Sequence, residues 1–210
     1  MKTEHLSSGE LSQILLAKKA VKLSPDKGFT WASGIKSPIY CDNRKLLSYP
    51  KVRSQITKTF ANYIRKNFPA VDVIAGVATG AIAWGVLVAQ ELEKSFIYVR
   101  SNAKAHGLAN RIEGEYKAGD VCLVIEDLVS TGGSSLEAVK ALREEGMGVK
   151  EMMALFSYDL PVSKINFETA ECQLTTLTNF EDLLQTAEKT GYIKKPEKHG
   201  ILEWQKKQGS

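Results

Sequence analysis

Residues 121–135 read VCLVIEDLVSTGGSS: an apolar run, two adjacent carboxylates, and a turn rich in hydroxyls and glycines. The apolar run predicts a buried strand over 121–125, and the residues after Gly133 predict a helix. A loop that leads from a strand into a helix can bind a phosphate on its backbone N–H groups and hydroxyls. Glu126 and Asp127 could face ribose hydroxyls or a hydrated Mg²⁺. The stretch therefore predicts a site for a sugar phosphate.

An ordinary helix cap is the alternative interpretation of this stretch. Ser and Thr favour N-cap positions and Gly favours tight turns, which accounts for Ser134 or Ser135. A cap does not account for two carboxylates that close an apolar strand, because their desolvation is costly unless solvent or a ligand compensates it. The stretch also lacks the G-K-[ST] of a P-loop and the G-x-G-x-x-G of a dinucleotide site.

The chain around this stretch alternates apolar runs with helical patterns. Strands are expected at 71–75, 96–99, 121–125 and 149–156, with helices at 81–92 and 133–145 between them. Such alternation predicts an α/β fold with a doubly wound parallel sheet that is covered on both faces. Ligands of such sheets bind at the carboxyl ends of the strands, where the Thr79–Gly80 turn and the 130–133 loop fall. Further helices are expected at 49–67, 180–188 and 196–206, further strands at 29–32, 38–41 and 171–177, and a capped first helix with an apolar stripe from Leu11 to Val21.

Composition limits the classes of function. The 210 residues suit one domain, and 43% hydrophobic with 25% charged residues is ordinary for a globular protein. A net charge of +4 suits an anionic ligand, and we expect no nucleic-acid partner. Cys41, Cys122 and Cys172 are odd in number and form no C-x-x-C pair, which argues against a disulfide framework or a zinc site and fits a reducing cytoplasm. Because no apolar run has the length of a membrane span, we expect no membrane partner.

The run VIEDLVSTGGS, from Val124 to Ser134, resembles the phosphoribosyl pyrophosphate (PRPP) motif of the type I phosphoribosyltransferase family. The resemblance implies that the acidic pair meets the ribose hydroxyls and that residues 130–134 hold the 5′-phosphate. The turn AGVATGA at 75–81 matches the family's pyrophosphate loop, which implies donation from backbone N–H groups at a helix start. The PRPP contacts implied in these two segments are Thr79, Gly80, Glu126, Asp127, Leu128, Val129, Ser130, Thr131, Gly132, Gly133 and Ser134.

A polar segment of about 18 residues separates two of the expected strands, and loops of such length are typically functional or disordered. It contains RSNAKAHG at 100–107 and resembles the catalytic loop of the orotate phosphoribosyltransferase family. In that family the loop closes over the active site, often that of the neighbouring subunit, which implies a homodimer. The resemblance implies that Arg100, Lys104 and His106 contact PRPP and its pyrophosphate. Many members have Lys directly after the Arg, where this chain has Ser101.

Residues 29–44, FTWASGIKSPIYCDNR, precede the expected sheet and permit a plain hairpin with turns at Ser-Gly and Ser-Pro. They also resemble the S-G-x-x-S-P-x-Y segment that covers the pyrimidine in orotate phosphoribosyltransferases. The resemblance implies that Tyr40 and Cys41 contact orotate, together with Ser130 and Tyr158.

Two ligand contacts of the orotate phosphoribosyltransferase family have no counterpart in this chain. Ala32 stands where many members have a Lys that contacts PRPP, and the residues around Tyr158 contain no Arg of the kind that contacts orotate in many members. The carboxylate of orotate needs hydrogen-bond donors, so Arg44, Lys36 and backbone N–H groups are the alternatives.

The resemblances together imply one phosphoribosyltransferase domain over 1–210, with a core at about 49–160. A hood is implied, formed by residues 1–48 and C-terminal elements. The implied reaction transfers the 5-phosphoribosyl group of PRPP to orotate in pyrimidine biosynthesis, with Mg²⁺ held mainly through PRPP near the acidic pair. Arg100, Lys104, His106 and Asp127 are the implied catalytic residues, and both Lys104 and His106 stay open as the proton donor.

Three alternatives accompany this interpretation. A phosphoribosyltransferase for another base would share the donor site but not the 29–44 segment. An RNA-binding nucleotide sensor of the same fold would show a basic stripe and salt-sensitive affinity. A pure interaction module has no use for two carboxylates beside a phosphate loop.

Overall fold

A six-stranded sheet forms the centre of the computed structural model, which describes residues 5–31, 34, 36–101 and 111–208. The strands lie in the order β10-β9-β8-β5-β6-β7, and all neighbours are parallel except β6 and β7. They are β5 (Val73–Val77), β6 (Ser95–Val99), β7 (Ile112–Glu113), β8 (Val121–Val129), β9 (Gly148–Ser157) and β10 (Gln173–Asn179). The α/β fold with a doubly wound sheet is confirmed.

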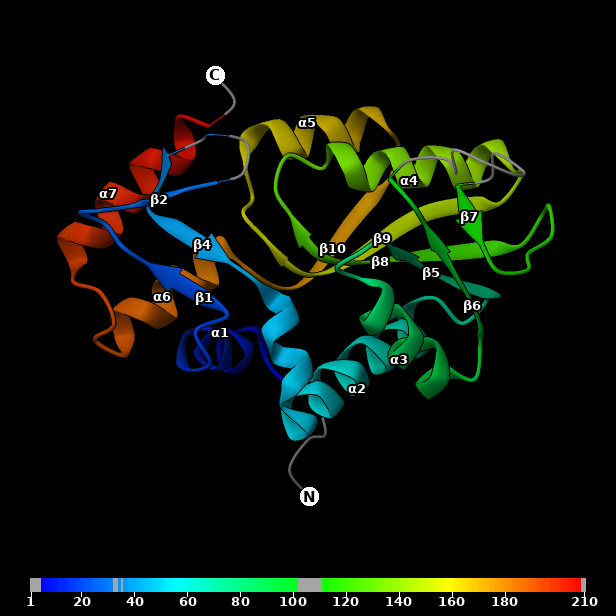
Figure 1. The fold of residues 1–210 in the computed structure, drawn as a ribbon, viewed down its shortest axis with the longest axis horizontal. Helices are drawn as coiled ribbons and strands as arrows, with labels where there is room; N and C mark the ends of the chain where they lie inside the picture. The colour runs from blue at the N-terminus through cyan, green and yellow to red at the C-terminus, as the bar shows by residue number, and fades with distance from the viewer. Residues whose placement is uncertain (1–4, 32–33, 35, 102–110, 209–210) are drawn as a thin grey trace.

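Helices cover both faces of this sheet (Figure 1). On one face lie α2 (Pro50–Asn67) and α3 (Ile82–Leu92), and on the other lie α4 (Gly133–Glu144) and α5 (Pro161–Thr169). All of β5 and most of β8 and β9 are buried, as expected of central parallel strands. The fully buried rings of Phe60, Trp84 and Phe156 belong to α2, α3 and β9 and form part of the core between these layers. Among the described residues, no helix combines the length and the apolar character needed to cross a membrane.

The hood combines segments from both ends of the chain. It contains α1 (Ser8–Ala17), β1 (Val21–Leu23), β2 (Phe29–Thr30), β3 (Lys36–Ser37), β4 (Ile39–Cys41) and the 3₁₀ helix η1 (Asn43–Ser48), with α6 (Phe180–Lys189) and α7 (Lys195–Lys206). The indole Nε1 of Trp204 in α7 donates to the carbonyl of Lys36 at 2.9 Å, and its ring meets Trp31 edge-on at 5.8 Å. The C-terminal helix therefore holds the β2–β3 hairpin in place.

The sequence prediction for the central strand is wrong at its end. β8 does not stop at Ile125 but continues through both carboxylates to Val129, because β9 pairs with it as far as Ser157. The sequence reasoning also missed α5, η1 and β7. The last of these is two residues long and exists through its antiparallel pairing with β6.

The first helix is also shorter than predicted. The predicted cap is confirmed, because Ser7 and Glu10 form a capping box. The helix ends at Ala17, and Lys19 adopts the left-handed conformation with φ +54°. Val21 then begins β1 opposite Cys41, so a long-range pairing takes the last residue of the apolar stripe.

Candidate active site

The carboxylate of Glu126 is buried inside β8, with 5% of the residue exposed. Its Oε1 accepts a hydrogen bond from the backbone N–H of Asp127 at 2.9 Å, and its Oε2 accepts one from the hydroxyl of Ser135 at 2.8 Å. Burial, followed by the charge of Asp127, raises the pKa of Glu126 well above its ordinary value. Burial also raises the pKa of Asp127, against the opposing effects of Glu126 and Arg44. Two such carboxylates favour a ligand that brings hydroxyls or positive charge.

Ser135 is not the helix cap that the sequence suggested. α4 begins after Gly132, and among the described residues no side chain caps its N-terminus. Ser135 is 1% exposed and donates its hydroxyl to Glu126 instead. The first N–H groups of α4 therefore keep the anion-binding capacity of an uncapped helix start.

The loop between β8 and α4 is supported from behind by α5. A Cβ at Gly132 would lie 2.6 Å from the ring of Phe167, and Gly132 has φ +83°, so this position requires glycine. The side-chain amide of Asn166 donates to the carbonyl of Thr131 at 2.9 Å. Thr131, Gly133 and Ser134 are exposed, as a phosphate site requires.

Two of the predicted PRPP contacts lie outside this loop. Leu128 and Val129 belong to β8, where they pair with Phe156 and Ser157 of β9. The side chain of Val129 is fully buried and Leu128 is half-buried. These two predicted PRPP contacts therefore belong to the end of the strand, just before the phosphate loop. Ser130, which follows them, is half-buried at the start of the loop.

The Thr79–Gly80 turn lies directly against the acidic pair. It connects β5 to α3, and β5 is the neighbour of β8 in the sheet. A Cβ at Gly80 would come within 2.5 Å of both carboxylate oxygens of Asp127, so glycine is what allows this approach. Thr79 is exposed. Because of this contact, the two predicted loops share one site although 47 positions separate Gly80 from Asp127 in the sequence.

Arg100 lies at the same edge of the sheet, immediately after β6. Its backbone N–H donates to the carbonyl of Arg111 at 2.8 Å, and its Nη1 lies 3.4 Å from Oε1 of Glu113. A cavity of about 160 Å³ there is lined by Arg100, Arg111 and Ser134, with Ala78 beside the turn. Lys104 and His106 lie outside the described residues.

The hood reaches this site through Asn43, which is 1% exposed. The side-chain amide of Asn43 donates to the carbonyl of Asp127 at 2.5 Å, and its Oδ1 lies 3.2 Å from the thiol of Cys41. Burial, followed by the charges of Asp127 and Asp42, raises the pKa of Cys41 well above its ordinary value. Tyr40 next to it is exposed. The structure thus brings the predicted orotate segment to the acidic pair, a link that the sequence reasoning missed.

Tyr158 lies close to this segment but is covered. Its ring stacks on Trp31 with the ring centroids 4.9 Å apart, and 3% of the residue is exposed. The side-chain amide of Gln205 in α7 donates to its carbonyl at 2.8 Å. This geometry supports the hood and does not favour the direct orotate contact expected of Tyr158. Arg44, an alternative donor to orotate, is exposed and pairs with Asp42 at 2.8 Å.

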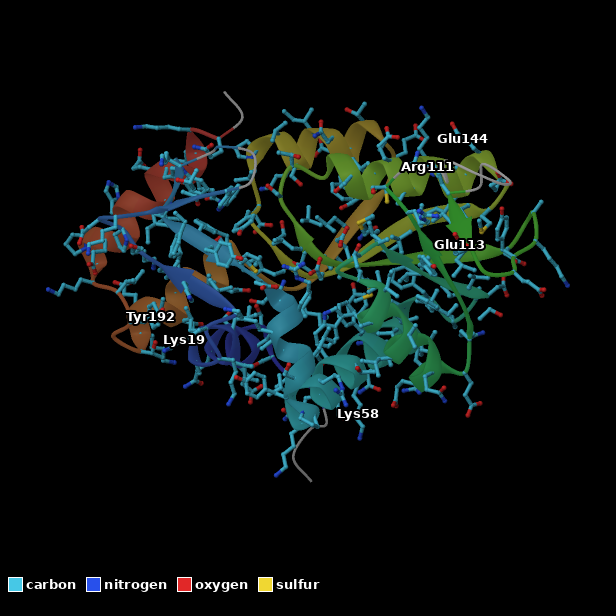
Figure 2. The ribbon with its side chains drawn as sticks, in the orientation of Figure 1. Lys19, Lys58, Arg111, Glu113, Glu144 and Tyr192 are labelled. Carbon is cyan, nitrogen blue, oxygen red and sulfur yellow. The ribbon has the colours of Figure 1, made fainter. Side chains whose placement is uncertain are left out.

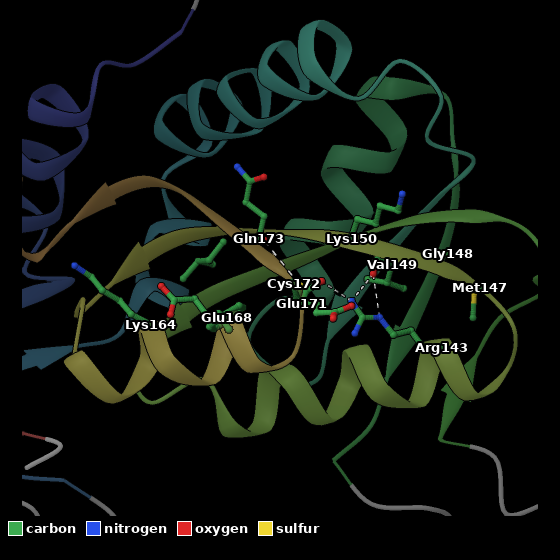
Figure 3. A pocket seen from close by; sticks show the side chains of 12 residues that line it. Arg143, Met147, Gly148, Val149, Lys150, Lys164, Glu168, Glu171, Cys172 and Gln173 are labelled. Carbon is green, nitrogen blue, oxygen red and sulfur yellow. Dashed lines mark hydrogen bonds between the residues drawn. The ribbon is translucent and has the colours of Figure 1, made fainter.

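A larger cavity, of about 900 Å³, lies at the N-terminal ends of β9 and β10, the ends that face away from the acidic pair (Figure 3). Arg143 crosses it and donates to the carbonyls of Val149, Ala170 and Glu171 at 2.6–3.0 Å. These bonds tie α4 to β9 and to the turn before β10. Because Arg143 is committed to backbone carbonyls, we interpret this cavity as structural.

Comparison with known proteins shows the family of this chain. The model of the phosphoribosyl transferase domain family matches residues 43–166. The orotate phosphoribosyltransferase of Phocaeicola vulgatus is 53% identical over 91% of each chain. This chain belongs to the orotate phosphoribosyltransferase family. Among solved structures, orotate phosphoribosyltransferase from Aeropyrum pernix is 25% identical with a TM-score of 0.74, over 88% of this chain and 99% of the other. The UMP synthase of Leishmania donovani is 28% identical with a TM-score of 0.79, over 95% of this chain and 42% of that longer one.

Proposed function

We propose that this member of the family transfers the 5-phosphoribosyl group of PRPP to N1 of orotate, as part of pyrimidine biosynthesis. The products are orotidine 5′-monophosphate and pyrophosphate. The observation that carries the proposal is the contact of Asn43 with both Cys41 and the carbonyl of Asp127. It supports a single site in which an acceptor base at the hood meets a ribose held at the acidic pair.

The reaction breaks the bond between ribose C1 and the pyrophosphate oxygen and forms a bond between C1 and N1 of orotate. Positive charge develops on the ribose while negative charge develops on the leaving group. We assign Glu126 and Asp127 to the ribose, because their field favours the cationic sugar. Residues 130–134 and the start of α4 then hold the 5′-phosphate. We assign the backbone of the Thr79–Gly80 turn to the pyrophosphate, because this turn lies against Asp127.

The leaving pyrophosphate requires cations. Arg100 borders the cavity beside Ser134, and we assign it, with Lys104 and His106, to stabilise the charge that collects on the pyrophosphate. Either Lys104 or His106 delivers the proton to this group. Exclusion of water from the site would protect PRPP from hydrolysis.

Mg²⁺ is the cofactor that we propose. Carboxylate oxygens suit this hard cation, and the half-buried Asp127 brings two of them to the Thr79–Gly80 turn. Bound through PRPP, Mg²⁺ supplies charge neutralisation to the pyrophosphate. We further propose a homodimer that shares the 100–107 loop between subunits. We also propose that the protein is cytoplasmic, which is supported by three free thiols, Cys41, Cys122 and Cys172.

The purified chain tests this proposal with PRPP and Mg²⁺ and each of four bases: orotate, uracil, hypoxanthine and adenine. We expect turnover with orotate and release of one pyrophosphate for each orotidine 5′-monophosphate formed. Turnover with a purine in place of orotate would show that the acceptor is assigned wrongly. Salt-sensitive RNA binding without any turnover would instead favour the nucleotide sensor.

Lys104→Ala tests the loop assignment. Because this variant removes a positive charge assigned to the leaving pyrophosphate, kcat should fall by roughly tenfold to a thousandfold. Lys117→Ala is the matched control, because Lys117 is exposed in a turn away from the acidic pair. If both variants kept the wild-type rate, the assignment of the 100–107 loop would be wrong.

A further inference from the structure

Arg111 is an arginine that no sequence motif identified, and it is placed beside Arg100 by the sheet. β7 runs antiparallel to β6, so that Ile112 pairs with Val99. The residues just outside this pair then meet: the carbonyl of Arg111 accepts from the N–H of Arg100 at 2.8 Å. The Nε of Arg111 also lies 3.4 Å from the carbonyl of Arg100. Figure 2 labels Arg111 at the α4 side of the molecule.

The cavity of about 160 Å³ next to Arg111 has the lining of an anion site. It is bordered by both arginines, by the hydroxyl-bearing Ser134 in the first turn of α4, by the carboxylate-bearing Glu137, and by Ala78 before the Thr79–Gly80 turn. Guanidinium groups and helix N-termini both favour phosphate oxygens, and arginine binds them through two parallel N–H donors. The segments around Ala78, Arg100, Arg111 and Ser134 thus meet at one small cavity, which apolar side chains also line.

The guanidinium of Arg111 has a carboxylate partner that is easily exchanged. Its Nη1 lies 3.5 Å from Oε2 of Glu137 in α4, with 28% of the Arg111 side chain and 58% of the Glu137 side chain exposed. An exposed pair at this distance contributes little, because water and salt screen it. A ligand with several negative charges would compete with Glu137 for the same guanidinium.

We propose that Arg111 binds the pyrophosphate group, first as part of PRPP and then as the leaving product, and that Glu137 is its partner in the empty site. This inference rests on the proposed function, since pyrophosphate is the group that must leave. As the bond to ribose C1 breaks, charge moves onto the pyrophosphate and the contact with Arg111 strengthens. Arg111 therefore acts on the leaving group, across the site from the orotate segment.

Steady-state kinetics of Arg111→Ala test this assignment, with inorganic pyrophosphate as the product inhibitor. We expect the KM for PRPP and the inhibition constant of pyrophosphate to rise by roughly tenfold or more, as for the loss of a charged hydrogen bond. The KM for orotate should stay within about twofold, because no residue of the 29–44 segment lines this cavity. Arg111→Lys keeps the charge without the two parallel donors and should recover part of the loss.

Two further variants separate a ligand contact from a structural one. Glu137→Gln removes the ion pair but keeps the arginine, so pyrophosphate should bind as well as to the wild type or more tightly. Arg65→Ala removes another exposed pair, with Glu91 at 3.6 Å, and should leave both constants unchanged. If Glu137→Gln weakened pyrophosphate as much as Arg111→Ala, the arginine would act by fixing α4, and the proposal would be overturned. It would be overturned equally if Arg111→Ala had no effect.

Calorimetry with pyrophosphate keeps this test independent of turnover. Should the wild-type chain fail to use orotate and PRPP, the proposed function fails, while the comparison of pyrophosphate binding between wild type and Arg111→Ala still decides the role of Arg111. Thermal melting of each variant checks that it folds, and Arg111→Lys serves if the alanine variant does not.

Discussion

Ser135→Ala should destabilise the protein by an amount that grows with pH. The hydroxyl of Ser135 is the donor to Oε2 of Glu126 at 2.8 Å, and both residues are buried. Alanine fits the same space but leaves that oxygen without the donor, while Oε1 keeps the N–H of Asp127. A hydrogen bond to a charged group contributes about 1.5–3 kcal/mol and a neutral one about 0.5–1.5 kcal/mol. The loss should therefore be about 1.5–3 kcal/mol where Glu126 is ionised.

The sign of the pH dependence follows from the raised pKa of Glu126. A carboxyl whose pKa is higher in the folded than in the unfolded state contributes stability below its unfolded pKa, and this contribution is lost as the pH rises through the folded pKa. The bond from Ser135 lowers that pKa, so its removal should raise the folded pKa further and steepen the loss. Unfolding in urea at about pH 5 and about pH 9 should show a larger deficit at the higher pH.

A double-mutant cycle with Glu126→Gln identifies the carboxylate as the partner. In the Gln background, Ser135→Ala should cost clearly less than in the wild type, with the same small cost at both pH values. A deficit below about 0.5 kcal/mol, or one that is larger at acid pH, would refute the argument that Ser135 compensates a buried charge.

Three further perturbations test the geometry of the site. Asn43→Ala leaves the carbonyl of Asp127 without its donor, so the free energy of unfolding in urea should fall by about 1–3 kcal/mol and the KM for orotate should rise. An unchanged KM would show that the hood is not part of the acceptor site. Gly80→Ala sets a Cβ against the carboxylate of Asp127 and should lower kcat/KM for PRPP by roughly tenfold or more. The control is Gly200→Ala, in open space within α7, which should stabilise the protein by about 0.5–1 kcal/mol and keep full activity. Because its raised pKa keeps the half-buried thiol of Cys41 protonated, iodoacetamide should modify it at mildly alkaline pH much more slowly than a small free thiol; an equal rate would contradict the raised pKa.

The local sequence was sufficient to predict the central strands and helices of the fold. The apolar runs and the helical stripes predicted the order of β5, α3, β6, β8, α4 and β9, because each pattern reflects burial on faces that the chain itself defines. The sequence also predicted the chemistry of residues 126–134, since carboxylates beside hydroxyls and glycines have few uses other than binding a polar ligand. The hood could be named from its resemblance to a family, whereas its residues alone permitted a plain hairpin.

The ends of elements and the joining of the site depended on partners far along the chain. β8 extends to Val129 because β9 continues beside it, and the first helix ends early where Val21 pairs with Cys41. No local pattern predicts such pairing, since its free energy comes from the neighbouring strand.

Sequence by itself therefore determined the fold class, the donor motif and the family, because these depend on residue types at short spacing. Only the tertiary structure decided which groups meet. It turned Ser135 toward Glu126, joined Asn43 to Asp127, covered Tyr158 with Trp31 and placed Arg111 at the cavity beside Arg100. Each of these contacts joins atoms from different elements, so its existence depends on how the sheet, the helices and the hood pack.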